Sequence, residues 1–336
     1  MTDHRKYHDK TLLFALAARA EVRKCPSSDW EFVKRRTAAD GAVWRSADGL
    51  LYKRTGDTSI DAEARFQRLV AALGYPVPEV VETGQVDGVH YVVERSAGSA
   101  SLHDLALAND DGQLGEDVLH TAVEVSVRLL TAQAHNPLPC GPEPAREWFA
   151  HAGFAGNVFT ENPDLDTPRV HAAVRRALCR LDDVPMCRSH LDYGLPNVFP
   201  GGVIDLQHHG VAPLGYDVYP LLEIVAFKGG NRGYEVTAEQ RTRYLAALDA
   251  AGSRLTGRPL GGYLGEFLLV KCFFFLALMR PSDPGRRDKY LKWRYRRTLF
   301  ERGLDQYESS GAIHTDTFPT LAAFSDRFTQ STAGHP

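Results

Sequence analysis

Cysteine is scarce in this 336-residue chain, and its placement argues against a disulfide framework and against a zinc site. No C-x-x-C pair occurs, and the number of cysteines is odd. The five residues are Cys25, Cys140, Cys179, Cys187 and Cys272. Scattered single cysteines are typical of buried, reduced thiols in proteins of reducing compartments. We therefore predict a cytoplasmic protein whose cysteines form no disulfide bond.

A long uninterrupted apolar run is also missing. The longest, residues 263–279, contains Glu266 and Lys271 and is too short and too charged for a membrane span. Residues 11–20 are apolar, but no convincing secretory cleavage pattern follows them. We therefore expect a core helix at 263–279, a surface helix near the N-terminus and no membrane contact.

The chain has little net charge. Its 39 Lys+Arg and 42 Asp+Glu give a formal charge of −3, which excludes a generally basic nucleic-acid binder. The charge is unevenly placed, however: from Leu206 on there are 17 Lys+Arg and 13 Asp+Glu, a net of +4, so the preceding residues carry −7. A hydrophobic share of 43% and a charged share of 24% fit a folded globular protein rather than a disordered chain.

The pattern of the first 95 residues predicts strands with one helix. Extended segments are predicted within 30–55 and 76–96, with a turn at 37–41. The Asp48-Gly49 dipeptide between two apolar runs predicts a hairpin. Apolar residues at helical spacing predict a helix over 60–74 that ends at Gly74.

Helical patterns dominate after Ser96. Helices are predicted at 101–108, 116–134, 170–182 and over most of the chain from Tyr216 on, with breaks at 229–230, 257–259 and 281–284. Short strands are predicted at 186–191, 197–200 and 202–207. The chain therefore divides into a strand-rich lobe and a larger helical lobe, joined near 94–98.

The stretch SHLDYGLPNVFPGGVIDLQ carries the most informative motif. It places His190, Asp192 and Asn197 as H-x-D-x-x-x-x-N, and Asp205 follows two β-branched residues. This set suits phosphoryl transfer, with Asp192 accepting the proton of an attacking hydroxyl. Asn197 and Asp205 offer the hard oxygen ligands that Mg²⁺ prefers, completed by substrate phosphates. We expect His190 to order the loop through hydrogen bonds.

These motifs resemble the aminoglycoside phosphotransferase and choline kinase-like family. Four segments carry the resemblance. ADGAVWRSADGLLYKR (39–54) resembles the family's nucleotide-covering hairpin, and AEARFQRLVAALGYPVPEVV (62–81) resembles its helix with a glutamate that pairs with the lysine. YVVERSAGSASLHDL (91–105) resembles its hinge, and GYDVYPLLE (215–223) resembles the segment that braces the catalytic loop. The resemblance implies an α+β, two-lobed protein-kinase-like fold. It implies a small antiparallel-sheet nucleotide-binding lobe at 1–95, including the N-terminal helix, and a larger, mainly helical catalytic and substrate-binding lobe at 96–336.

The same resemblance implies roles for residues outside the central motif. Lys53 would hold the α- and β-phosphates, and Glu63 would fix Lys53 through a salt bridge. Glu94 and Ser96 lie at the implied hinge, where backbone groups contact the base. Backbone N–H groups around Gly41 are candidates for the phosphates, although that loop holds only one glycine. Asp217 would brace the catalytic loop.

Departures from protein kinases narrow the function. Position 191 is Leu where protein kinases carry Arg, and LQHHG follows Asp205, with no A-P-E motif further on. A phosphorylation-gated protein kinase is therefore disfavoured. A metal pair at 208–209 is disfavoured too, because adjacent side chains on an extended segment point apart. Basic and aromatic residues interleave at 286–302, which indicates an amphipathic helix packed through Tyr290, Trp293 and Leu299 rather than a nucleic-acid surface.

The predicted activity is transfer of the γ-phosphate of ATP or GTP, with Mg²⁺, to a hydroxyl of a small molecule. The resemblance favours an antibiotic phosphotransferase that confers resistance or self-protection. The +4 charge of the later part of the chain disfavours a polycationic acceptor and favours a neutral or mildly charged one. A metabolite kinase for an amino alcohol, sugar or amino acid is the alternative, and a nucleotide-binding pseudokinase is a further one. We expect no nucleic-acid partner.

Overall fold

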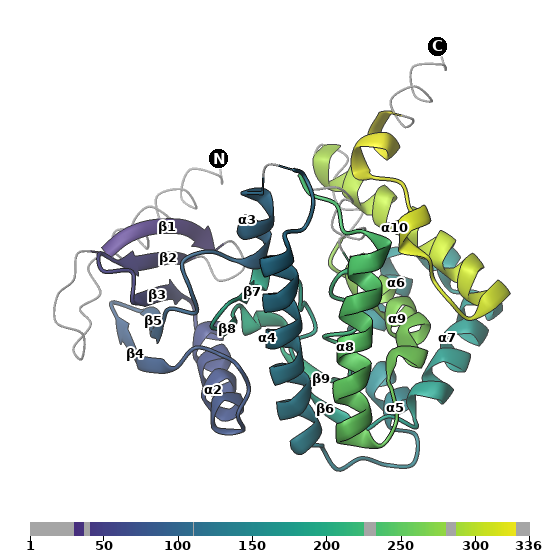
Figure 1. Ribbon diagram of the computed structural model, residues 1–336, viewed down its shortest axis with the longest axis horizontal. Coiled ribbons are helices and arrows are strands. Elements are labelled where there is room, and N and C mark those ends of the chain that lie inside the picture. The colour runs from purple at the N-terminus through teal and green to yellow at the C-terminus, as the bar shows by residue number, and fades with distance from the viewer. Residues whose placement is uncertain (1–29, 37–40, 110, 225–232, 280–286, 327–336) are drawn as a thin grey trace, which may run out of the picture. The chain divides into compact units, whose positions relative to one another are not determined.

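The structure is a computed structural model that describes residues 30–36, 41–109, 111–224, 233–279 and 287–326. The predicted N-terminal helix, the turn at 37–40, Cys25 and the breaks at 229–230 and 281–284 lie outside these residues. The chain divides into two compact units (Figure 1). The first comprises Met1–Leu102 and Pro196–His209, and the second comprises His103–Leu195 and Gly210–Pro336.

An antiparallel five-stranded sheet in the order β1-β2-β3-β5-β4 forms most of the first unit. Its strands are β1 (Trp30–Arg36), β2 (Gly41–Ser46), β3 (Leu51–Gly56), β4 (Val80–Val86) and β5 (Val89–Arg95). The predicted hairpin at Asp48-Gly49 is confirmed: Gly49 has a φ of 71° and donates its N–H to the Ser46 carbonyl. A positive φ is easily adopted by glycine, which has no Cβ.

Helix α2 (Ser59–Ala72) packs on one face of this sheet through Ile60 and Ala64, which contact Val92 of β5. The helix ends where the sequence predicts, because Gly74 has a φ of 82° and its N–H and that of Tyr75 cap the last carbonyls. The first unit also contains the short hairpin of β7 (Val198–Phe199) and β8 (Gly202–Val203), followed by the 3₁₀ turn η3 (Leu206–His208). The predicted second lobe therefore includes a segment, 196–209, that the structure places in the first unit.

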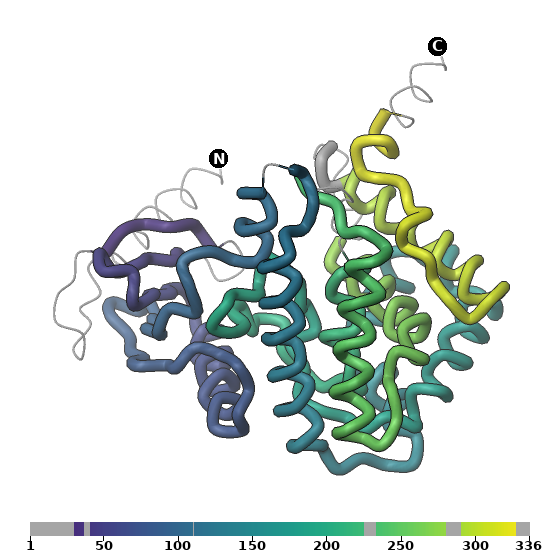
Figure 2. Tube along the Cα trace, viewed as in Figure 1, coloured from purple at the N-terminus to yellow at the C-terminus, as the bar shows by residue number. Residues whose placement is uncertain are grey.

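The second unit is mainly helical. Its helices are α4 (Glu116–His135), α5 (Pro144–His151), α6 (Phe154–Glu161), α7 (Pro168–Leu181), α8 (Ala238–Thr256), α9 (Leu264–Ala277) and α10 (Arg287–Ser310). The short helix α3 (Leu102–Leu107) spans the boundary between the units. Helices α4 and α8 lie side by side (Figure 2). The sequence patterns do not predict α5 and α6, which are both short.

The second unit contains a two-stranded antiparallel sheet, whose strands precede and follow the central motif in the sequence. Strand β6 (Met186–Ser189) pairs with β9 (Gly210–Pro213), a strand that the sequence patterns do not predict. Because β6 ends at Ser189, His190 is the first residue of the loop that leaves the sheet. The β6–β9 pair therefore fixes where the loop of the H-x-D-x-x-x-x-N motif begins.

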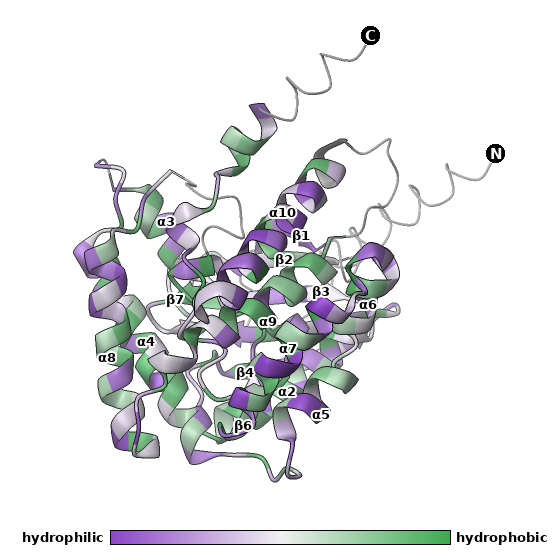
Figure 3. Cartoon of the chain, turned by 90° about the vertical axis from the view of Figure 1, so that its right-hand side faces the viewer, coloured by the Kyte–Doolittle hydropathy of each residue, from purple (hydrophilic) through white to green (hydrophobic). Residues whose placement is uncertain are grey.

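Helix α9 forms the core of the second unit, as predicted for 263–279. Residues from Gly265 to Leu276 are all buried, including the CFFF run, and Figure 3 shows the helix mostly in the hydrophobic colour. Trp293 and Leu299 of α10 are buried, which confirms the predicted packing of that helix. Among the described helices none alone has the length and apolarity to span a membrane, although α8 and Gly261–Ala277, bent by 107°, reach that threshold as a pair.

Candidate active site

Lys53 and its neighbour Arg54 lie on opposite faces of strand β3, because side chains alternate along a strand. Lys53 has no exposed surface, and its Nζ lies 5.0 Å from the ring centroid of Trp30 and 5.7 Å from that of Trp44. Burial lowers the pKa of Lys53 to about 8. Arg54 lies opposite Val92, on the face that α2 covers.

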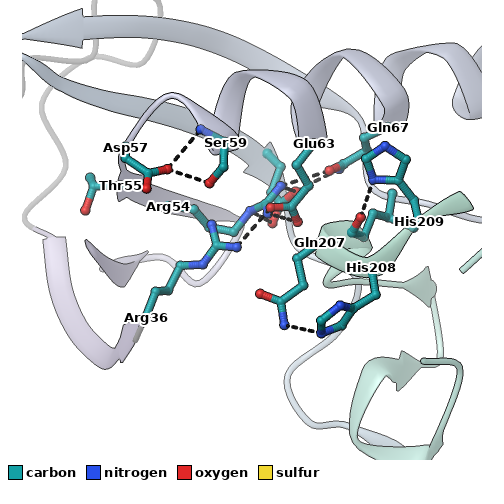
Figure 4. Close-up of polar contacts among 12 residues, drawn as sticks. Arg36, Arg54, Thr55, Asp57, Ser59, Glu63, Gln67, Gln207, His208 and His209 are labelled. Carbon is teal, nitrogen blue, oxygen red and sulfur yellow. Dashed lines mark hydrogen bonds and ion pairs between the residues drawn. The ribbon is translucent and has the colours of Figure 1, made fainter. Parts of the chain in front are cut away.

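Arg54 makes the ion pair with Glu63 that the sequence assigned to Lys53, so the predicted Lys53–Glu63 pair is wrong. The Arg54 Nη1 donates to Glu63, and its Nη2 donates to Gln67 at 2.9 Å (Figure 4). The same Nη2 donates to Glu94 at 3.1 Å. Arg36 of β1 donates to the other oxygen of Glu63 at 2.9 Å. The prediction is displaced by one residue along β3, and a displacement of one residue in a strand moves the side chain to the other face of the sheet.

These contacts make a buried cluster of two guanidinium and two carboxylate groups. Burial alone lowers the pKa of Arg54, but the Glu94 and Glu63 carboxylates outweigh it and raise that pKa above its ordinary value. Burial alone raises the pKa of Glu63, but Arg54 and Arg36 outweigh it and lower that pKa. Asp205 also raises the pKa of Arg54, so its carboxylate lies close enough to act on the cluster.

Gly41 has a structural reason to be glycine. A Cβ built at this position would lie 1.7 Å from the carbonyl oxygen of Thr55, so β2 could not approach β3 there with any larger residue. The next N–H, of Ala42, donates to the Thr55 hydroxyl at 3.1 Å. Part of the backbone around Gly41 is therefore already paired within the sheet, and its contact with phosphates stays a prediction.

The implied hinge residues are also held internally. The Glu94 carboxylate is buried and accepts hydrogen bonds from Arg54 and from Gln67, the latter at 2.7 Å. The N–H of Ser96 donates to the Leu50 carbonyl at 2.8 Å. The side chain of Glu94 thus serves the arginine cluster, and the roles of Glu94 and Ser96 at the base stay predictions.

Asn197 and Asp205 are brought together by the β7–β8 hairpin. Asn197 immediately precedes β7, and its carbonyl accepts the N–H of Ile204 at 3.0 Å. Asp205 follows and has a left-handed backbone with a φ of 65°, a conformation in which Asp and Asn are enriched. Both side chains are half-buried. The hairpin therefore pairs the backbone of Asn197 with that of Ile204, the residue before Asp205.

These two residues fit a magnesium ion in the chemistry of their donors, since both offer hard oxygen ligands. Within the described ranges no group of three or more His, Cys, Asp or Glu side chains could hold a metal. Mg²⁺ usually takes only one or two carboxylates and draws its other ligands from water and substrate phosphates. A site of this kind needs a nucleotide to complete it.

The loop after β6, which the sequence predicts to be catalytic, is held by a buried carboxylate. Asp217 accepts hydrogen bonds from the Ser189 hydroxyl at 2.7 Å and from the N–H groups of His190 and Leu191 at 2.9 Å and 3.0 Å. The bracing role that the resemblance implies for Asp217 is confirmed. His190 is buried and acts here through its backbone, whose carbonyl also accepts the N–H of Asp192 at 2.9 Å. The Asp192 side chain is half-buried.

The structure adds two arginines that the motifs do not reveal, Arg36 and Arg54. The alternation of side chains along β3 is a signal for Arg54. Its side chain lies on the face of the sheet that packs against α2, and only a side chain on that face can contact Glu63 of the helix. The role of Arg36 depends on pairing between β1 and β2 and leaves no local signal.

Two tempting motifs have structural roles. His209 stacks on Phe66 with ring centroids 4.0 Å apart, and His208 contacts the neighbouring Gln207 (Figure 4). In α10, Arg296 donates to the Phe275 carbonyl at 2.8 Å, and Arg297 pairs with Asp164. Part of the basic stretch at 286–302 therefore serves internal packing.

Comparison with known sequences identifies the phosphotransferase enzyme family, whose profile matches residues 24–260. No curated protein sequence matches the chain. Among solved structures, a proposed aminoglycoside phosphotransferase from Ralstonia eutropha is 13% identical, with a TM-score of 0.55, and the match covers 88% of this chain and 98% of that one.

Two further solved structures have lower similarity scores. An aminoglycoside phosphotransferase from Streptomyces rimosus, in complex with ADP and streptomycin, is 18% identical, with a TM-score of 0.48 and coverage of 78% and 98%. An ethanolamine kinase from Plasmodium vivax is 9% identical, with a TM-score of 0.44 and coverage of 91% and 82%. At 13% identity the Ralstonia eutropha structure supports the fold alone, which is the protein-kinase-like fold that the sequence predicts.

Proposed function

Because the chain belongs to the phosphotransferase enzyme family and so is a small-molecule phosphotransferase that acts on hydroxyl groups, we propose that it transfers the γ-phosphate of magnesium-bound ATP or GTP to a hydroxyl of an antibiotic. The observation that carries the proposal is the catalytic loop. Its backbone is fixed by Asp217, and it carries a half-buried carboxylate, Asp192, at the spacing of a phosphoryl-transfer motif.

In this proposal Asp192 accepts the proton of the acceptor hydroxyl as that oxygen attacks the γ-phosphate. A carboxylate can do this at neutral pH without a strongly perturbed pKa, because its main task is to orient the hydroxyl. Asp217 keeps the loop in place, and His190 contributes through its backbone.

Asn197 and Asp205 would hold the magnesium ion. When bound, Mg²⁺ neutralises charge on the β- and γ-phosphate oxygens. The Asp205 carboxylate acts on the charge of Arg54 in the buried cluster. We therefore assign to Arg54, assisted by Arg36, the phosphate contact predicted for Lys53. The two arginines balance Glu63 and Glu94, so a divalent ion at Asp205 leaves a positive excess for a polyphosphate.

The acceptor is proposed to be neutral or mildly charged, such as a nucleoside, macrolide or peptide antibiotic. The residues from Leu206 on carry a net +4, which is unfavourable for a polycationic ligand. A coupled ADP-release screen over antibiotics and common metabolites, with ATP and GTP in parallel, tests this choice. Turnover with an amino alcohol, a sugar or an amino acid, and with no antibiotic, would instead establish a metabolite kinase.

The mechanism predicts that Asp192→Ala removes most turnover and leaves nucleotide affinity nearly unchanged. Loss of a general base typically costs about 10²–10⁴-fold in rate. Steady-state turnover and calorimetric binding of magnesium nucleotide measure the two effects separately. Asp183→Ala is the matched control, since Asp183 is an exposed carboxylate in the turn before β6. Wild-type turnover in the Asp192 variant would disprove the assigned base.

A further inference from the structure

Lys271 of α9 is a fully buried lysine that contacts the catalytic loop. None of its side chain is exposed, and its Nζ donates a hydrogen bond to the Leu191 carbonyl at 2.6 Å. The same Nζ lies 4.0 Å from the ring centroid of Tyr216. A buried ammonium group is costly to desolvate, and in a core helix it usually serves a specific partner. The partner here is the residue immediately before Asp192.

The backbone of Leu191 is strained. Its φ is 63°, in the left-handed region, and the N–H of Asp192 donates to the His190 carbonyl at 2.9 Å, which closes a three-residue turn around Leu191. A turn of this kind with a positive φ is rare and energetically unfavourable. Such a conformation persists only where the surroundings hold it.

Two buried groups of opposite charge hold this turn from its two ends. The Asp217 carboxylate accepts the N–H of Leu191 at 3.0 Å, and the Lys271 ammonium donates to its carbonyl at 2.6 Å. The carbonyl belongs to the peptide bond that joins Leu191 to Asp192. Because that bond is planar, a group that fixes its oxygen also fixes the direction in which the next residue leaves the turn.

We propose that Lys271 is a positioning residue for Asp192: its ammonium group holds the Leu191–Asp192 peptide in the strained turn and so aims the proton-accepting carboxylate. The inference rests on the role proposed above for Asp192. Asp217 alone secures only the first half of the turn, up to the N–H of Leu191. Lys271 secures the second half, from the Leu191 carbonyl onward.

Tyr216 lies close to both the Lys271 ammonium and the Asp217 carboxylate. Its ring lies under the ammonium of Lys271, and its hydroxyl is buried. Burial raises the pKa of Tyr216 well above its ordinary value, and the Asp217 and Asp192 carboxylates raise it further. Both carboxylates are therefore near the ring that Lys271 covers, in agreement with an ammonium group placed to act on the loop.

The test is Lys271→Met, which keeps the length and the packing of the side chain and removes its charge. We expect kcat for ADP release from magnesium ATP or GTP to fall by about 10- to 100-fold, as for a displaced catalytic group. The KM for the nucleotide should change by less than about twofold, because the variant affects a step after binding. Lys271→Arg keeps a cationic donor and should recover part of kcat.

Glu266→Gln is the matched control. Glu266 is a fully buried charge on the same helix, and its partners are Arg180 at 2.7 Å and Tyr307 at 2.9 Å rather than the catalytic loop. This variant should keep the kcat of the wild type even where it lowers the melting temperature. Amide hydrogen exchange of residues 190–193 gives a readout that needs no turnover: it should accelerate in Lys271→Met and stay unchanged in Glu266→Gln.

Failure of the inference and failure of the proposed function give different results. Normal turnover in Asp192→Ala would overturn the assigned base. A lost activity in Asp192→Ala together with kcat within about twofold of the wild type in Lys271→Met would overturn only the positioning role. Unchanged amide exchange at residues 190–193 in Lys271→Met would overturn the positioning role as well. So would a general defect in Lys271→Met, with a lower melting temperature, a higher nucleotide KM and a lower kcat, that Lys271→Arg does not repair.

Discussion

At the scale of single residues, two neighbouring cations of β3 have opposite environments. Arg54 has two carboxylates and an amide as partners, whereas the ammonium of Lys53 lies among the rings of Trp30 and Trp44. An arginine fits several acceptors at once through its planar fork of donors. The lysine faces aromatic surfaces, which compensate only part of the cost of burying a charge.

The lowered pKa of Lys53, caused by burial, predicts that Lys53→Met stabilises the protein at neutral pH. The pKa of Lys53 is lowered from 10.5 to about 8, so the unfolded chain binds this proton more tightly than the folded one. The penalty is fully present below pH 8 and is relieved as the pH rises toward 10.5. We expect the free energy of unfolding at pH 7, from urea titration, to rise by about 2 kcal/mol.

The gain should shrink as the pH is raised from 8 toward 10.5, because the wild-type lysine then loses its charge. Arg54→Met is the counterpart on the next residue of the strand. It leaves Glu63 and Glu94 buried near each other with less compensation, and should cost about 3–5 kcal/mol. A loss of stability in both variants would show that Lys53 is a partner in a favourable pair.

The comparison also shows how far single residues can be predicted from sequence. The H-x-D-x-x-x-x-N motif is recognisable because its residues lie at a fixed spacing within one short segment. The role of Asp217 follows from the resemblance of residues 215–223 to the family's loop-bracing segment. The partner of Glu63 was misassigned because the choice between Lys53 and Arg54 depends on the face of the strand that α2 covers. Sequence patterns show Lys271 only as an interruption of an apolar run, because its contact with Leu191 spans 80 residues.

At the scale of elements, both ends of helix α8 are set by local capping groups. Helix α8 begins with a capping box, in which Thr237 accepts the N–H of Gln240 at 3.1 Å and the Gln240 side chain accepts the N–H of Thr237 at 3.1 Å. It ends at Gly257, which has a φ of 77° and lies at the predicted break. Strand β9 was missed because it exists only as the partner of β6.

The capping box predicts that Thr237→Ala lowers the free energy of unfolding by about 1 kcal/mol, the usual cost of losing a side-chain N-cap. Thr242→Ala is the matched control, because Thr242 lies exposed within the same helix and bonds only to the Ala238 carbonyl. Alanine is the better helix former at such a position, so the control should be neutral or slightly stabilising. Equal losses in the two variants would contradict the role of the cap.

At the scale of the whole molecule, the chain returns to the first unit after the catalytic loop. Residues 196–209 lie in the sequence between β6 and β9 of the second unit, yet they belong to the compact unit of the five-stranded sheet. The proposed metal residues Asn197 and Asp205 are therefore in the same unit as Arg54 and Glu63. Sequence patterns could not show this, because compactness depends on contacts such as that of the Val203 N–H with the Pro76 carbonyl.

This arrangement predicts that magnesium nucleotide stabilises the folded protein and that Asp205 carries the magnesium-dependent part. A ligand at 100 times its Kd adds about 2.7 kcal/mol to the free energy of unfolding. Asp205→Asn removes the charge while keeping a residue that tolerates the left-handed φ of 65°. ATP alone should raise the melting temperature of this variant by as much as ATP with magnesium does. In EDTA the wild type should show the same loss of the magnesium-dependent part of the shift.

Asp87→Asn separates this effect from the substitution itself. Asp87 also has a positive φ, of 50°, and lies exposed in the turn between β4 and β5. The same chemical change at a similar backbone conformation should therefore leave the full magnesium-dependent shift in place. If Asp205→Asn retains that shift as well, the carboxylate of Asp205 does not hold the ion, and the charge balance proposed for Arg36, Arg54, Glu63 and Glu94 has to be met without it.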